Sequence, residues 1–227
     1  MLSTPIVTID GPSGSGKGTI ARAVAVRAGW HLLDSGALYR LVALAGLKQA
    51  LKSDDTDGHT RIASSMDVRF DVGSDGGEVV ILAGEEVTGQ IRSEEAGQGA
   101  SRVAAWPSVR SALLDRQRAF AKAPGLVADG RDMGTVVFPE ADLKIFLTAT
   151  PDERALRRYK QLKDKGSDVS LPALSREITE RDLRDSTRAV APLKPAPDAE
   201  VIDSTSLTIE QVIDRVTVLG RVRALWA

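Results

Sequence analysis

The 227-residue chain contains no cysteine, has almost no net charge and has no long apolar run. Without cysteine it can form neither a disulfide framework nor a thiolate zinc site. A formal net charge of −1 gives no overall basic field toward nucleic acid or an anionic membrane. No apolar run approaches the length that spans a bilayer, and the first residues lack the pattern of a signal peptide. We therefore expect a cytoplasmic protein that binds neither nucleic acid nor membrane.

What the chain does contain is an ordinary globular composition, with 42% hydrophobic residues. Its length suits one large α/β domain or a core with a small insert. Short apolar runs alternate with longer segments of helical periodicity, and we expect the runs to be strands at residues 5–9, 30–34, 125–130, 143–149 and 199–204. Strands that alternate with helices indicate an α/β fold, with a parallel sheet that helices cover on both faces.

One region breaks this alternation and indicates a small insert. Met66, Val68, Phe70 and Val72 alternate with polar residues, which is typical of a half-buried strand. A glycine-rich turn at residues 73–77 and a returning strand at residues 78–87 complete an antiparallel hairpin. We therefore predict a core of residues 1–63 and 96–227, with an inserted lobe at residues 64–95.

The stretch GPSGSGKGT follows the first expected strand and precedes a helix. Gly11, Gly16 and Lys17 have the spacing of a phosphate-binding loop, whose backbone amides and lysine cradle a triphosphate. Gly18 departs from this pattern, which usually has Ser or Thr for Mg²⁺ at that position. A flexible turn is the alternative. We expect an ATP site formed by residues Gly11, Pro12, Ser13, Gly14, Ser15, Gly16, Lys17, Gly18 and Thr19.

Two further segments place polar residues after expected strands. Ser35, Tyr39 and Arg40 begin a helix at the carboxyl edge of the sheet, where ligands of α/β proteins bind. The run GRD follows Asp129, a strand-ending carboxylate of the kind that holds a magnesium-bound water. The alternatives are a capping serine with a surface Tyr–Arg pair, and an ion-paired turn.

Clustered arginines point to phosphate chemistry near the carboxyl terminus. Arg181, Asp185 and Arg188 are spaced to share one face of a helix, and guanidinium groups suit phosphate. A second basic helix at about residues 154–170 would form a lid over the triphosphate, with Arg154, Arg157 and Arg158. Solvated, salt-bridged helix faces are the alternative for both segments.

The chain resembles the bacterial cytidylate kinases over nearly its full length, because it contains their characteristic stretches in the same order. These enzymes are nucleoside monophosphate kinases of the P-loop type. The stretches that carry the resemblance are GPSGSGKGT, HLLDSGALYR, SRVAAWPSVRSALLDRQRAF, ADGRDMGTVVFP, KIFLTA, ERDLRDSTRAVAPL and VIDST. Trp106 stands where phenylalanine is expected in this family. The short, cysteine-free lid excludes the zinc-bearing lid of some adenylate kinases.

The resemblance implies ATP-dependent phosphorylation of CMP and dCMP on a P-loop NTPase-type sheet, with the insert as acceptor lobe. It implies three groups of acceptor-binding residues: Ser35, Ser101, Arg110 and Asp132 around cytosine; Arg40, Arg131 and Arg188 on the phosphate; Arg181 and Asp185 on the ribose. Tyr39 is also expected at the CMP site.

Catalysis is expected to come from Lys17, Arg131, Arg188 and Asp129, with Mg²⁺ as cofactor. No direct protein ligand to the metal is expected, only the nucleotide phosphates, waters and an outer-shell contact from Thr19 or Asp129. We expect a monomer. Kinases for UMP, dTMP or shikimate, and a non-catalytic nucleotide switch, are the alternative functions.

Overall fold

The computed structural model describes residues 4–72, 78–164, 166 and 168–226. The chain divides into two compact units, Met1–Asp34 with Gln117–Ala227, and Ser35–Arg116. No helix within the described ranges is long and apolar enough to cross a membrane.

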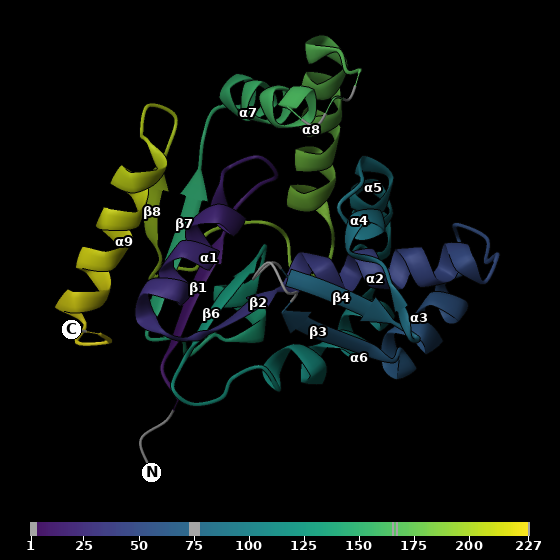
Figure 1. Ribbon diagram of the computed structural model, residues 1–227, viewed down its shortest axis with the longest axis horizontal. Helices are drawn as coiled ribbons and strands as arrows, with labels where there is room; N and C mark the ends of the chain where they lie inside the picture. The colour runs from purple at the N-terminus through teal and green to yellow at the C-terminus, as the bar shows by residue number, and fades with distance from the viewer. Residues whose placement is uncertain (1–3, 73–77, 165, 167, 227) are drawn as a thin grey trace. The chain divides into compact units, whose positions relative to one another are not determined.

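A five-stranded sheet forms the centre of the first unit (Figure 1). Its strands are β1 (Ile6–Asp10), β2 (His31–Asp34), β6 (Leu126–Gly130), β7 (Leu143–Thr148) and β8 (Glu200–Asp203). They lie in the order β2-β6-β1-β7-β8, and every neighbouring pair is parallel. The predicted α/β fold class is therefore confirmed. The register pairs Asp129 with both Ile9 and Asp34, so the carboxyl ends of the three neighbouring strands meet.

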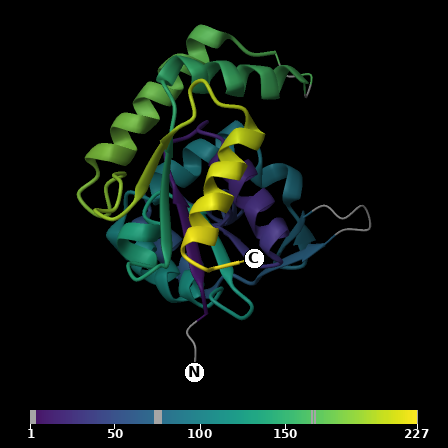
Figure 2. The same ribbon diagram turned by 90° about the vertical axis from the view of Figure 1, so that its left-hand side faces the viewer.

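Helices α1 (Lys17–Ala28) and α9 (Ile209–Val222) pack against each other and on the sheet. Figure 2 shows α9 in front of the strands of this sheet. Ile20 and Val24 of α1 join Val212 and Val216 of α9 in the main core, which the helical spacing of these residues predicts. Helices α7 (Pro151–Asp164) and α8 (Leu171–Thr187) pack against each other in the same unit. A single π-helical turn, η1 (Met133–Val137), follows β6.

The second unit combines helices with an antiparallel sheet. Its elements are α2 (Ser35–Lys48), α3 (Thr56–Ser65), β3 (Val68–Val72), β4 (Glu78–Leu82), β5 (Glu85–Glu86), α4 (Thr88–Ile91), α5 (Glu94–Val103) and most of α6 (Pro107–Arg118). The antiparallel pairing of β3 and β4 confirms the predicted hairpin. Met66 is buried, and Val68 and Phe70 are partly buried, whereas Asp67, Arg69 and Asp71 are exposed. The predicted turn at residues 73–77 lies outside the described residues.

The prediction of one returning strand at residues 78–87 was wrong. Ala83 (φ 50°) and Gly84 (φ 82°) reverse the chain, so that β5 folds back on β4. Two consecutive left-handed residues make a tight hairpin turn, which Asn-Gly or Asp-Gly signals far more strongly than Ala-Gly. The ends of the predicted insert are helical rather than extended, because α3 includes Ser65 and α4 begins at Thr88.

Candidate active site

The loop between β1 and α1 has a backbone that only glycine allows. A Cβ atom at Gly11 (φ 155°) would overlap the carbonyl oxygen of Leu147. Gly14 (φ 76°) and Gly16 (φ 89°) are left-handed, and Gly16 provides no side-chain cap for α1. The first amides of α1 therefore stay available for an anion, as in other helix-terminal phosphate sites.

The departure from the usual loop pattern at Gly18 has a steric reason. A Cβ atom there would lie 3.1 Å from Oδ2 of Asp129, which is closer than an ordinary van der Waals contact. Glycine at this position lets the Asp129 carboxylate approach the first turn of α1.

Lys17 is the first residue of α1, and its side chain is only 12% exposed. Its Nζ lies 4.0 Å from Oδ1 of Asp129 and donates to the carbonyl oxygen of Pro12 over 3.4 Å. Burial, together with Arg131 and Arg181, lowers the pKa of Lys17 to about 7, against the opposing effect of Asp129. The site therefore holds more positive charge around Lys17 than its own carboxylates offset.

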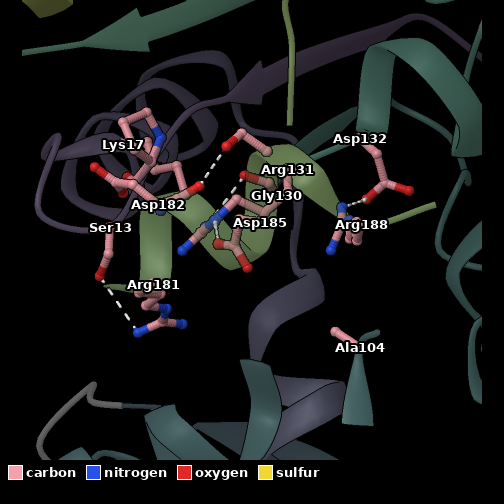
Figure 3. A network of polar contacts seen from close by, with 12 residues as sticks. Ser13, Lys17, Ala104, Gly130, Arg131, Asp132, Arg181, Asp182, Asp185 and Arg188 are labelled. Atoms are coloured by element: carbon pink, nitrogen blue, oxygen red, sulfur yellow. Dashed lines mark hydrogen bonds and ion pairs between the residues drawn. The ribbon is translucent and has the colours of Figure 1, made fainter. Parts of the chain in front are cut away.

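Figure 3 shows two charged pairs in the same unit as this lysine, Arg131 with Asp185 and Arg188 with Asp132. Nε of Arg131 donates to Oδ2 of Asp185 over 3.1 Å, and Nη2 of Arg188 lies 3.9 Å from Oδ1 of Asp132. Burial by itself would raise the pKa of Asp185, but Arg131, Arg181 and Arg188 outweigh it and hold that pKa below its usual range.

Arg188 is not on the helix that its spacing predicts. Helix α8 ends at Thr187, and Arg188 follows it in an extended conformation (φ −60°, ψ 141°). Its Nε donates to the carbonyl oxygen of Ala191 over 2.5 Å. The prediction of a helix face shared by all three residues was therefore wrong for Arg188, although the fold still brings it close to Asp185.

Two of the three predicted lid arginines contact the phosphate loop itself. Arg154, which is 3% exposed, donates to the carbonyl oxygens of Ala149 and Ser13. It also forms a bidentate pair with Asp182 of α8. Arg157 donates to the carbonyl oxygen of Ser15. The third, Arg158, donates to Gln161 of its own helix. Their roles toward ATP stay predictions.

The other predicted acceptor residues lie in the second unit. Ser35 and Tyr39 are buried on α2, with Arg40 beside them, and Ser101 is buried on α5. Arg110 of α6 is also buried, and its guanidinium lies 5.5 Å from the centre of the Tyr39 ring. Nη1 of Arg110 donates to the carbonyl oxygen of Ala104 over 3.2 Å.

A sequence profile of the cytidylate kinase family matches residues 7–221. The chain belongs to the cytidylate kinase family. It is 60% identical over 213 residues to the cytidylate kinase of Stutzerimonas stutzeri (strain A1501), with 93% of each chain covered. The cytidylate kinase of Aeromonas hydrophila subsp. hydrophila is 59% identical over 216 residues, which cover 95% of this chain and 93% of that one.

Membership of the cytidylate kinase family confirms the family resemblance and the activity predicted from the sequence. The protein is an ATP-dependent nucleoside monophosphate kinase that phosphorylates CMP and dCMP to CDP and dCDP. The non-catalytic switch and the kinases for other acceptors are thereby set aside.

Three acidic residues were not among the predicted site residues of this cytidylate kinase. Asp34 lies opposite Asp129 in the sheet register and acts on the pKa of Lys17. Asp182 holds Arg154, and Asp10 ends β1 directly before the phosphate loop. Asp34 and Asp10 both end strands at the ligand-binding edge, which is a signal that the sequence contains. No comparable signal marks Asp182.

Proposed function

We propose that Lys17, Arg131, Arg188 and Asp129 carry the catalysis of this kinase, while residues 11–19 hold the triphosphate of ATP. One observation supports this assignment: Arg131 and Arg181 lie close enough to a buried lysine to lower its pKa. Such crowding of like charges is relieved when phosphate oxygens bind among them. The acceptor phosphate is already anionic, so the reaction needs alignment and charge neutralisation rather than a general base.

For the acceptor, we propose that the phosphate of CMP binds Arg40, Arg131 and Arg188, and that the ribose binds Arg181 and Asp185. The hydrogen bond that Arg131 donates to Asp185 supports this, because it holds one cation in place for the phosphate. Cytosine would contact Ser35, Ser101, Arg110 and Asp132. Its amine suits the carboxylate or the hydroxyl groups, and its carbonyl and ring nitrogen suit the arginine. The cation–π contact of Arg110 with the Tyr39 ring is consistent with a fixed guanidinium at the base.

We propose Mg²⁺ as the cofactor. Mg²⁺ usually keeps several waters and binds the phosphates of its substrate, so phosphates and waters would supply most ligands. Asp129 and Asp34 are register partners near Lys17 and fit a role toward metal-bound waters, with Thr19 as a further candidate. When bound, the ion would neutralise charge on the phosphates.

The lowered pKa of Lys17 leads to a test of the ATP site. A triphosphate beside Lys17 favours its charged form, so ATP binding must raise a pKa that is about 7 in the free protein. At pH 8 we therefore expect binding to take up as much as about one proton, and the affinity for ATP to fall as the pH rises above about 7. Calorimetry without CMP, in buffers of different ionisation enthalpy, measures this uptake.

Lys17→Met serves as the matched variant for this measurement, because it keeps the length of the side chain but has no titratable group. The uptake should disappear in it. Identical proton uptake in both proteins would show that another group titrates and that Lys17 does not change its protonation when ATP binds.

We also propose that the predicted insert, residues 64–95, acts as the acceptor lobe. If it does, CMP should slow amide hydrogen exchange in residues 66–91 more than ATP does. Peptides from α9 provide the internal control, because that helix belongs to the other unit. Equal protection by the two nucleotides would argue against an acceptor lobe at these residues.

Finally, we propose that the kinase works as a monomer in the cytoplasm. Both nucleotide substrates are cytoplasmic metabolites.

A further inference from the structure

The carboxylate of Asp10 joins two loops that are far apart in the sequence. Asp10 is the last residue of β1 and is 5% exposed. Its Oδ1 accepts from the backbone N–H of Met133, and its Oδ2 accepts from that of Gly134, each over 2.8 Å. The residue that directly precedes the ATP loop therefore binds the segment that directly follows Arg131 and Asp132.

The two amides are the first of the π-helical turn η1. Amides at the start of a helical turn have no partner within it, and the side chain of the preceding residue commonly accepts from the second or third of them. That residue is Asp132, whose type is well suited to capping. Its carbonyl oxygen accepts from Val136 and Val137, but its side chain makes no capping bond. Instead, its carboxylate lies near Arg188.

We propose that Asp10 is a positioning residue for base recognition. Because Asp10 accepts from the first amides of η1, the Asp132 carboxylate can contact the acceptor base instead of capping this turn. The proposal rests on the role proposed above for Asp132. A carboxylate at position 132 has two alternative uses, as a local cap or as a ligand group. Asp10 already occupies the amide of Gly134, one of the two that a side chain at position 132 would cap.

The two hydrogen bonds stabilise the charged form of Asp10, which its surroundings disfavour. Burial raises the pKa of Asp10 to about 7, and the nearby carboxylates of Asp132 and Asp129 act in the same direction. The bonds from Gly134 and Met133 oppose this rise. The amides of Met133 and Gly134 therefore hold the buried Asp10 carboxylate in position beside Asp132 and Asp129.

The test compares Asp10→Ala with Asp142→Ala. Asp142 makes a bond of the same kind at the other end of the strand, since its Oδ2 accepts from the N–H of Ile6 over 2.8 Å. We expect Asp10→Ala to lower the ratio of kcat/KM for CMP to that for UMP by about fivefold or more, with the affinity for ATP changed less than about threefold. Asp142→Ala should leave the ratio unchanged. Asp10→Asn, which retains one acceptor oxygen, should give an intermediate ratio and replaces Asp10→Ala if that variant does not fold.

A crystal structure of the Asp10 variant provides a readout that does not depend on activity. The Asp132 carboxylate should turn onto the amide of Gly134, which Asp10 no longer occupies. A carboxylate that stays in place, or a ratio that Asp142→Ala lowers equally, would overturn the proposal.

The variant Asp132→Ala tests the role of Asp132 separately from that of Asp10. If Asp132→Ala does not change the CMP to UMP ratio, that role is wrong, whatever the crystal structure of the Asp10 variant shows. If both roles are right, Asp10→Ala should have no further effect on the ratio in the Asp132→Ala background.

Discussion

Replacing Lys17 by alanine is expected to lower kcat by about a thousandfold while the protein stays folded. Removing one charge-stabilising group from a preorganised site typically costs about 10²–10³ in rate, and groups that neutralise a transferring phosphoryl cost up to about 10⁵. The effect should appear in kcat more than in the KM for CMP, because Lys17 is assigned to the donor. Steady-state kinetics with ADP release coupled to a colour change measures it.

The structure adds an expectation for stability. Lys17 lies among Arg131 and Arg181, which disfavour its charge. Its removal should therefore leave the melting temperature unchanged or raise it. Lys122→Ala is the matched control, because Lys122 is an exposed lysine in the same unit. Near-normal turnover of a folded Lys17→Ala protein would exclude the assigned role.

The second large effect is expected from Asp132→Ala on base discrimination. A buried carboxylate accepts from the amine of cytosine but repels the carbonyl that uracil has in its place. Loss of a matched polar contact costs about 1–3 kcal/mol, and a charged partner favours the upper part of this range. Since 1.4 kcal/mol is a factor of about ten, the ratio of kcat/KM for CMP to that for UMP should fall about tenfold or more.

Two companion variants sharpen this measurement. Asp132→Asn keeps the shape of the side chain and offers an N–H donor to the uracil carbonyl, so it should lower the ratio at least as far. Arg188→Met should slow both substrates, because Arg188 is assigned to the phosphate that they share. The pairing of Arg188 with Asp132 predicts that the two effects are not additive. Equal slowing of CMP and UMP by Asp132→Ala would mean that Asp132 does not read the base.

Local patterns along the chain predicted the features that depend on near neighbours. The apolar run before Asp10, the spacing of Gly11, Gly16 and Lys17, and the alternation after Met66 each specify a conformation within about ten residues. Those predictions of strands, a helix start and a hairpin were confirmed. The turn at Ala83 and Gly84 was missed, because alanine is a poor signal for a left-handed conformation.

The sequence by itself determined the parallel α/β core, the glycine loop and, through motifs in a fixed order, the family and its reaction. Only the tertiary structure decided that α8 ends before Arg188, that Arg154 is bound to Asp182 and Ser13, and that Asp10 caps a turn 123 residues away. The physical reason is the range of the interactions. Periodicity and backbone steric limits act between neighbours in the chain, whereas a buried charged or capping group takes whichever partner the folded chain brings within hydrogen-bonding distance.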